Sequence, residues 1–182
     1  MRRAPLQQRS VERVNQMLDV AAALLDEGGY DALSTRAVAA RTGLPIGSIY
    51  RFFQDKRALA DALARRNLDS FLGRIAARLA ARLAGREPPG LSWAQVVDLV
   101  VDEYLDMKAT VPGFAVLDFG ANAEVADALA ALLGVTPAPR ARRALLLAVE
   151  TADALLRTHH ADPEMVEETK EMLRSYLARR LA

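Results

Sequence analysis

Glycine and proline interrupt this chain at intervals, and the segments between them are rich in alanine and leucine. Within those segments apolar residues recur with the roughly 3.6-residue period of an α-helix, and the alternation typical of half-buried strands is absent. Breaks at Gly28-Gly29, Gly43 and Pro88-Pro89-Gly90 separate successive helices, and a further short helix is expected over Pro112–Phe119. The pattern predicts an all-α protein with about nine helices joined by short connections.

Several of the expected helices carry a start signal. Ser92 and Gln95 have the spacing of a capping box, in which the two side chains bond free backbone N–H groups of the first turn. Asp55 and Asp162 stand where a carboxylate caps the following helix, and Thr136 precedes a proline suited to a first helical position.

The composition argues against several classes of function. The chain has no cysteine, which excludes disulfides, thiolate metal sites and cysteine nucleophiles. Its two histidines, His159 and His160, are adjacent, so on a helix they project about 100° apart and are poorly placed to share a metal. The sequence shows no glycine-rich phosphate loop, nucleophile elbow or zinc-protease motif. We therefore expect neither an enzyme nor a bound cofactor or metal.

The net charge of +1 is unevenly distributed. Residues up to Arg57 include nine basic and six acidic side chains, or +3, whereas the remainder carries fifteen against seventeen, or −2. A basic N-terminal part suits contact with a polyanion such as DNA. No apolar run approaches the roughly 20 residues that span a bilayer, and no secretory signal is recognisable, so we expect a cytoplasmic protein without membrane attachment.

The most informative stretch is Leu33–Lys56, which reads as two short helices joined by a tight turn at Gly43. Glycine there adopts the positive φ that reverses the chain. Two helix N-termini with free N–H groups suit phosphate oxygens, and small outward residues on the second helix allow close approach to a groove wall. The arrangement predicts a helix-turn-helix, whose second helix enters the major groove of DNA.

This region resembles the N-terminal domain of TetR-family transcriptional regulators. Four pieces carry the resemblance in the family's order and spacing, namely Ala21–Tyr30, Ser34–Ala39, Gly43–Tyr50 and Phe53–Lys56. The resemblance implies a DNA-binding domain over residues 1–56 and a ligand-binding and dimerisation domain over residues 57–182.

The resemblance also implies which side chains meet DNA. Expected at phosphates are Thr35, Arg36, Tyr50 and Lys56, and expected at base edges are Ile46, Gly47 and Ser48. Ser34 is expected among the DNA-binding residues as well. Arg51 reaches either a guanine edge or a phosphate, and the methyl groups of Ile46 favour thymine. The sequence departs from the family at Pro45, where a serine or threonine usually caps the second helix.

Bulky residues of the middle helices are expected, by the same resemblance, to line an effector pocket. The candidates are Phe71, Trp93, Tyr104, Met107, Phe114 and Phe119, with Asp118 and Glu150 as polar anchors. Aromatic and methionine side chains with a few polar groups are typical of small-molecule sites. The same spacing also fits a plain helical core, and both interpretations stay open.

The last two helices are more apolar than a single core requires, which favours a second partner. In TetR-like proteins these helices pair with their twins in a four-helix dimer interface. The predicted interface residues are Leu145, Val149, Ala152, Leu156, Met165, Thr169, Met172 and Tyr176. A symmetric dimer holds two reading heads about 34 Å apart, or a multiple, on a palindromic operator. The alternative is that the first of the two helices is buried centrally in a monomer.

Charged residues of the middle helices also recur at a helical spacing. A solvated acidic ridge is expected to face a row of arginines: Asp98, Asp102 and Asp106 opposite Arg74, Arg78 and Arg82.

These features predict a homodimeric one-component regulator, a repressor whose operator is released when a small molecule binds the larger domain. Two alternatives remain open. One is a ligand-independent DNA-binding protein. The other is a helical enzyme or carrier that retains the DNA-binding head and uses a buried acid such as Glu150.

Overall fold

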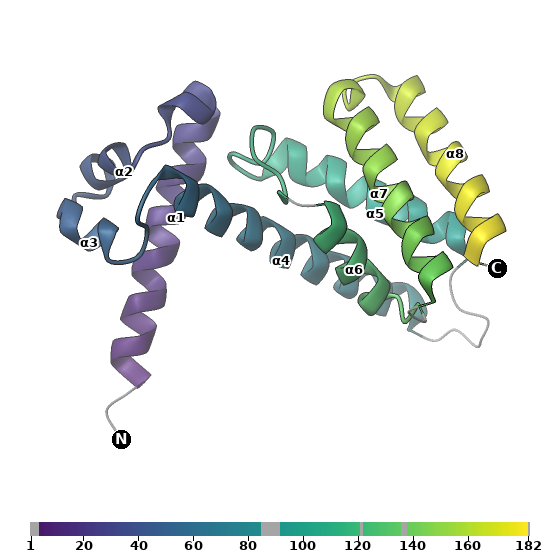
Figure 1. The fold of residues 1–182 in the computed structure, drawn as a ribbon, viewed down its shortest axis with the longest axis horizontal. Coiled ribbons are helices and arrows are strands. Elements are labelled where there is room, and N and C mark those ends of the chain that lie inside the picture. The colour runs from purple at the N-terminus through teal and green to yellow at the C-terminus, as the bar shows by residue number, and fades with distance from the viewer. Residues whose placement is uncertain (1–3, 85–91, 121, 136–137, 182) are drawn as a thin grey trace. The chain divides into compact units, whose positions relative to one another are not determined.

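Eight helices form the described part of the chain, which comprises residues 4–84, 92–120, 122–135 and 138–181 of this computed structural model and contains no strand. The helices are α1 (Ala4–Ala32), α2 (Thr35–Thr42), α3 (Ile46–Tyr50), α4 (Lys56–Leu83), α5 (Trp93–Thr110), α6 (Asn122–Leu132), α7 (Pro139–His159) and α8 (Pro163–Leu181) (Figure 1). The predicted all-α fold is confirmed. The break expected at Pro88-Pro89-Gly90 and the helix start expected at Thr136 lie outside the described residues.

The segment expected as a further helix, Pro112–Phe119, forms a series of turns instead. Gly113 has a φ of 75°, in the left-handed region that favours glycine. Its N–H donates to the carboxylate of Asp26 at 2.7 Å. A Cβ at Gly113 would lie 2.9 Å from the carbonyl oxygen of Ala22, so the turn packs closely on α1. These tertiary contacts replace the helical hydrogen bonds that the sequence suggested.

The capping signals at Asp55, Ser92 and Asp162 are confirmed. The N–H of Ser92 donates to Oε1 of Gln95 at 3.0 Å, and the N–H of Gln95 donates to Oγ of Ser92 at 3.3 Å. Asp55 and Asp162 each accept the backbone N–H three residues further on, at 2.8 and 3.2 Å. Each side chain therefore satisfies an N–H group that would otherwise lack a partner at the helix start.

The break predicted at Gly28-Gly29 lies within α1, where both glycines leave helical geometry. Gly28 has φ −145° and ψ 18°, and Gly29 has φ 66° and ψ −166°. A Cβ at Gly28 would lie 2.7 Å from the Cβ of Ala32, so a larger residue would displace the end of α1. The regular part of α1 therefore ends where the sequence predicted.

Packing divides the chain into two compact units. The first comprises the residues up to Asn67 together with Lys108–Gly120, and the second comprises Leu68–Met107 together with the residues after Gly120. Helix α4 contributes its first part to one unit and its second part to the other. The predicted boundary between residues 56 and 57 does not coincide with this packing division, and it stays a prediction about function.

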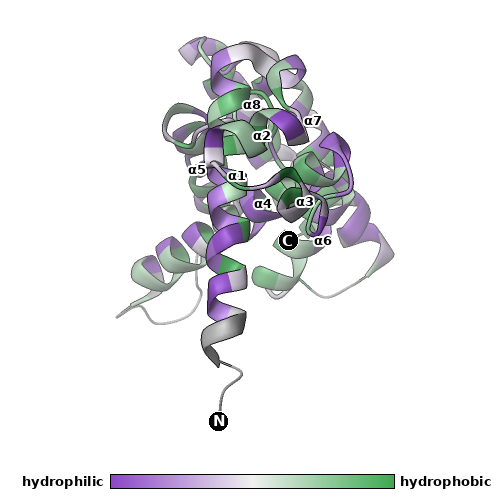
Figure 2. Ribbon diagram, turned by 90° about the vertical axis from the view of Figure 1, so that its left-hand side faces the viewer, coloured by the Kyte–Doolittle hydropathy of each residue, from purple (hydrophilic) through white to green (hydrophobic). Residues whose placement is uncertain are grey.

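The core of the first unit is built from α1, α2, α3 and the start of α4. Met17, Leu25, Ile49, Leu59 and Leu63 are all 0% exposed. Hydrophilic and hydrophobic patches alternate along α1, as expected for a helix that buries one side (Figure 2). Burying a side chain of this size stabilises a fold by about 1.5–3 kcal/mol. Helix α3 is too short to be stable alone, so it depends on packing against the core. Ile49 is the buried residue of α3 that provides this packing.

The second unit packs α7 against both α6 and α8. Its most deeply buried large side chains are Phe71, Ile75, Leu99, Met107 and Leu156, each at most 2% exposed. Phe71 and Ile75 come from α4, and Leu99 and Met107 come from α5. The second half of α4 is therefore an integral part of this core.

Candidate functional site

The two helices α2 and α3 are joined by the turn that the sequence predicted. Oγ of Ser34 accepts the N–H of Ala37 at 3.0 Å and so caps α2. Gly43 ends α2 with a φ of 68°. Helix α3 begins after Pro45 without a side-chain capping bond, as expected from the missing serine or threonine.

Helix α3 has one buried side and one exposed side. Ile49 is fully buried, whereas Ile46 is 40% and Tyr50 is 47% exposed. Gly47 is exposed and Ser48 is half-buried. The side chains expected to read base edges therefore lie on the free side of a short helix that is anchored through a single isoleucine.

Two of the residues expected at phosphates differ in exposure. Arg36 is exposed, but Thr35 is buried, with 8% of its surface accessible. An outward Thr35 side chain, which a phosphate contact suggests, is therefore not what the fold provides. Its hydroxyl donates to the Tyr50 hydroxyl at 3.5 Å, which links the start of α2 to the end of α3.

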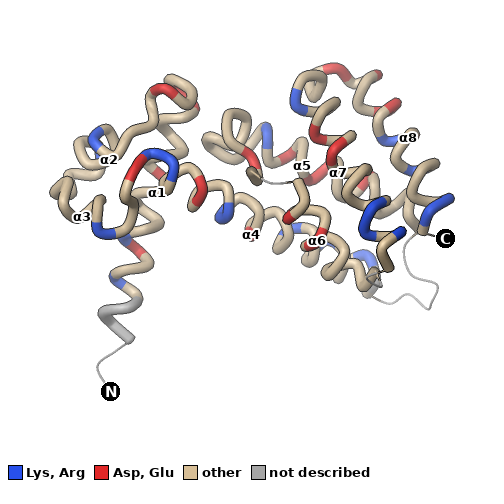
Figure 3. The backbone as a smooth tube through the Cα atoms, in the orientation of Figure 1, with Lys and Arg blue, Asp and Glu red and all other residues tan. Residues whose placement is uncertain are grey.

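The basic residues near α3 are marked blue along the backbone in Figure 3, and they differ in whether they have a carboxylate partner. Arg41 forms a two-pronged ion pair with Glu27, with N···O distances of 2.6 and 2.7 Å. Hydrogen bonding to Arg41 lowers the pKa of Glu27 and raises the pKa of Arg41. Arg36 and Arg51 are exposed, and neither has a carboxylate partner within the part of the chain that the structure describes. Their charge is therefore available to an anion.

Lys56, the first residue of α4, is half-buried. Its Nζ lies 4.1 Å from the centroid of the Tyr30 ring. Tyr30 ends the Ala21–Tyr30 segment that resembles the family, and the sequence alone indicates no role for its side chain. No periodicity in the sequence signals this contact, because the two residues lie on different elements.

The residues expected to line an effector pocket fall into both units. Phe114, Asp118 and Phe119 belong to the turn segment of the first unit, where the two phenylalanine rings meet edge to face with centroids 5.1 Å apart. Phe71, Trp93, Tyr104, Met107 and Glu150 belong to the second unit.

Four of these residues are buried in the cores of their own units, and Glu150 lies at the surface. Phe71, Met107 and Phe114 are at most 2% exposed, and Tyr104 is 8% exposed. Glu150 is exposed and accepts a hydrogen bond from the amide of Asn122 at 3.1 Å. A pocket lined by this set stays a prediction.

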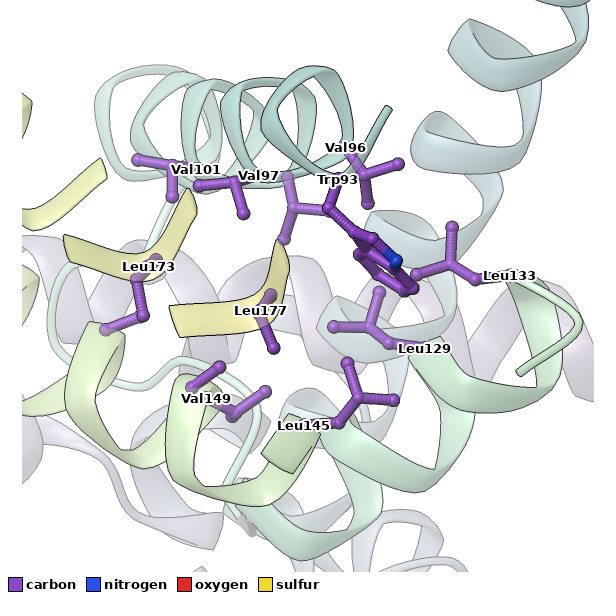
Figure 4. A pocket seen from close by; sticks show the side chains of 13 residues that line it. Trp93, Val96, Val97, Val101, Leu129, Leu133, Leu145, Val149, Leu173 and Leu177 are labelled. Atoms are coloured by element: carbon purple, nitrogen blue, oxygen red, sulfur yellow. The ribbon is translucent and has the colours of Figure 1, made fainter. Parts of the chain in front are cut away.

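The second unit contains an apolar cavity of about 60 Å³ among α5, α6, α7 and α8 (Figure 4). Its thirteen lining residues are all apolar, and Trp93 is the one member that the sequence assigned to a pocket. Because a water molecule occupies about 30 Å³ in the liquid and needs polar partners, the cavity suits a small uncharged group.

The residues expected at a dimer interface also divide by exposure. Leu145, Val149 and Ala152 line the apolar cavity, and Leu156 and Thr169 are at most 1% exposed. Leu145, Leu156 and Thr169 are thus buried within their own unit, whereas Val149 and Ala152 are half-buried.

The remaining candidates lie nearer the surface. Met165 and Tyr176 are half-buried, and Met172 is 44% exposed. Leu147, which the sequence reasoning did not single out for the interface, is 49% exposed on α7. An apolar helix does not reveal which of its sides faces its own core, and the set of interface residues stays a prediction.

The acidic ridge expected along α5 is only partly confirmed. Asp106 pairs with Arg74 of α4 at 3.0 Å. Asp98 and Asp102 instead meet α8, where they pair with Arg174 and Lys170. The aspartates thus connect α5 to two neighbouring helices rather than forming one solvated row.

Among the described residues, no group of His, Cys, Asp or Glu is arranged to hold a metal ion. None of the described helices combines the length and apolarity needed to cross a membrane.

Two family models match the chain. The N-terminal model of the bacterial regulatory proteins of the tetR family matches residues 17–63. The model described as the tetracyclin repressor-like C-terminal domain matches residues 121–181.

Solved structures and curated sequences give consistent matches. A TetR-family transcriptional regulator from Streptomyces coelicolor aligns with a TM-score of 0.81 and 47% identity, covering 93% of this chain and 99% of that one. The multidrug binding protein EbrR, solved with imidazole, aligns with a TM-score of 0.57 and 25% identity over 90% of this chain and 94% of that one. The HTH-type transcriptional repressor KstR of Rhodococcus jostii is 33% identical over 123 residues, which are 63% of this chain and 53% of the repressor. The chain therefore spans about half the length of that curated relative.

Proposed function

Because the chain belongs to the TetR family of bacterial transcriptional regulators, we propose that this DNA-binding regulator is a homodimeric repressor. Each head holds one half of a palindromic operator, and a small molecule in the second unit releases the DNA. A regulator of this kind acts in the cytoplasm, where its operator lies.

The observation that carries the proposal is the orientation of α3. Ile49 fixes one side of this helix in the core, while Ile46 and Tyr50 are 40% and 47% exposed. The unpaired, exposed Arg36 and Arg51 lie on the same short helical pair. A free helix with small residues flanked by cations suits a major groove bordered by phosphates.

Specific contacts follow from this orientation. We assign Ile46, Gly47 and Ser48 to base edges, and Arg51 to a guanine edge or a phosphate. The phosphate contacts are assigned to the backbone at Ser34 and Thr35 and to the side chains of Arg36, Tyr50 and Lys56.

Dimerisation is assigned to the outer sides of α7 and α8. Leu147 is 49% and Met172 is 44% exposed, and exposed large apolar side chains on adjacent helices favour a protein partner. A two-fold axis through these helices gives two heads, whose spacing of about 34 Å or a multiple fits successive turns of the duplex.

Release by a small molecule requires only that the ligand binds more tightly to the conformation that misfits the operator. The difference amounts typically to about 1–3 kcal/mol. The apolar cavity beside Trp93 supports an uncharged ligand or ligand part. The relative EbrR is described as a multidrug binding protein and was solved with imidazole.

The test of DNA binding is a salt titration with the full-length protein and a fragment carrying the promoter nearest its own gene. Fluorescence anisotropy is expected to show affinity that falls steeply between about 50 and 200 mM salt. Arg36→Met removes one phosphate contact and is expected to reduce the slope of log K against log salt by about 1.

Arg143→Met is the matched control, because Arg143 is an exposed arginine of α7 in the second unit. It is expected to leave the slope unchanged. An affinity that does not vary with salt would contradict the proposed phosphate contacts.

The test of ligand release uses Trp93, the single tryptophan of the chain, as an internal fluorophore at the cavity. An effector is expected to change Trp93 fluorescence and to lower promoter binding at the same concentration. If compounds change the fluorescence without altering DNA affinity, the protein is a ligand-independent DNA binder.

A further inference from the structure

Tyr30 and Lys56 form a contact between the end of α1 and the start of α4. Nζ of Lys56 lies 4.1 Å from the centroid of the Tyr30 ring, well inside the range in which the ring attracts a cation. Tyr30 is 43% exposed, so its ring is not a core side chain that happens to touch a lysine. Both residues belong to the first unit.

The backbone fixes the position of each partner. Tyr30 follows Gly29, whose φ of 66° redirects the chain, and the Tyr30 carbonyl accepts the N–H of Leu33 at 3.4 Å. Leu33 is 1% exposed and anchors this turn in the core. The ring of Tyr30 is thus carried by an ordered turn rather than by a free end.

Lys56 is fixed by the helix that it begins. Asp55 accepts the N–H of Ala58 at 2.8 Å with its side chain and the N–H of Leu59 at 3.3 Å with its carbonyl oxygen. The neighbouring carboxylate is therefore engaged in capping α4. Lys56 has no carboxylate partner in the part of the chain that the structure describes.

We propose that Tyr30 is a positioning residue for DNA binding, which holds the Lys56 ammonium group so that it donates to a phosphate of the duplex. The ring occupies one side of the ammonium group and leaves N–H donors free on the other. A free lysine loses considerable rotamer entropy when it binds, and holding it in advance reduces that cost. The inference rests on the phosphate contact assigned above to Lys56.

The chemistry predicts which substitutions matter. Tyr30→Phe keeps the aromatic face, so the contact persists, whereas Tyr30→Leu removes the face and keeps an apolar side chain of moderate size. An exposed cation–aromatic pair corresponds to a factor of about 2 to 5 in an equilibrium constant. Lys56→Met removes the charge and keeps the length of the side chain.

The experiment is a double-mutant cycle with full-length protein and a random-sequence duplex of 30 base pairs at low salt, followed by fluorescence anisotropy. Tyr30→Leu is expected to weaken binding by about 2 to 5-fold, and Tyr30→Phe is expected to bind as the wild type does. Lys56→Met is expected to reduce the salt slope by about 1. In the Lys56→Met background, Tyr30→Leu is expected to have no further effect.

A second measurement needs no DNA. In the free protein, the methylene protons next to Nζ of Lys56 are expected to show an upfield ring-current shift by NMR, present in Tyr30→Phe and lost in Tyr30→Leu. An unchanged thermal midpoint of unfolding in both variants excludes a general loss of structure.

Two different failures are distinguishable. If Tyr30→Leu weakens binding equally with and without Lys56, or has no effect in the wild type, the positioning role of Tyr30 is overturned. If the wild type fails to bind any duplex, DNA binding itself fails, while the ring-current shift still reports whether Tyr30 holds Lys56.

Discussion

Glu103 of α5 is a buried carboxylate that is paired with two arginines. Its side chain is 1% exposed and pairs with Arg74 at 3.2 Å and with Arg78 at 2.5 Å. Both arginines remain partly in water, with 39% and 46% of their side chains exposed. The buried carboxylate of Glu103 cannot be hydrated in place of its partners, so its charge depends on the two arginines more than their charges depend on it.

This asymmetry predicts unequal costs for breaking the cluster. The double variant Arg74→Met/Arg78→Met leaves a buried carboxylate without a cation, which is expected to lower the free energy of unfolding by about 3–5 kcal/mol. Glu103→Gln leaves Arg78 without this carboxylate but in contact with water, while Arg74 keeps its pair with Asp106, so the change is expected to cost about 1–2 kcal/mol. Urea unfolding of the two variants measures the difference. Equal costs would show that the buried charge is compensated in another way.

The pair of Glu27 and Arg41 predicts a dependence on pH. Because Arg41 lowers the pKa of Glu27 in the folded state, the pair stabilises the fold above the ordinary pKa of a glutamate. That contribution is lost as the pH falls through the lowered pKa. The difference in thermal midpoint between wild type and Glu27→Gln is therefore expected to be larger at pH 7 than at pH 3. A difference that grows on acidification would contradict this sign.

Single elements differ in how far the sequence alone predicted them. The turn between α2 and α3 and the caps at Ser92 and Asp162 depend on a few neighbouring residues, and all were predictable. The turns over Pro112–Phe119 depend on Asp26, which lies far away in the sequence. They could therefore not be predicted from the neighbouring residues. Local hydrogen bonds leave a local signal, whereas a long-range contact leaves none.

Two glycines of the first unit allow a matched comparison. Gly43 and Gly113 have φ values of 68° and 75°, so alanine is strained at both, at a cost of about 1–2 kcal/mol. A Cβ at Gly43 meets nothing within 4 Å, whereas one at Gly113 would lie 2.9 Å from the backbone oxygen of Ala22. Gly113→Ala is therefore expected to cost an additional ~1–3 kcal/mol. Chemical denaturation compares the two variants, and a smaller cost at Gly113 would contradict the close packing on α1.

For the whole molecule, the proposed dimer depends on which apolar side chains of the last two helices reach the surface. Leu147 and Met172 are the exposed large apolar side chains of α7 and α8. Leu145 lines the apolar cavity and is 4% exposed, so it is buried within the chain. The proposed interface is therefore smaller than the apolar circumference of α7 suggested.

This argument predicts the effect of charges on assembly. The double variant Leu147→Glu/Met172→Glu is expected to convert a dimer into a monomer, because paired interfaces would bury carboxylates without partners. Val116→Glu is the matched control, since Val116 is 45% exposed in the first unit. Light scattering after size exclusion measures the mass of each. A dimer that survives the double variant would place the interface elsewhere.

The sequence by itself determined the helical class, the pair of short helices joined by a turn at Gly43, and the helix caps at Asp55, Ser92 and Asp162. Helical period and capping chemistry act over a few residues, so they can be read along the chain. The tertiary structure alone decided that Thr35 is buried, that Tyr30 meets Lys56, and that Leu145 faces a cavity. These facts depend on which residues distant in the sequence come into contact. Periodicity shows that a helix has an apolar side, but it does not show which element packs against that side.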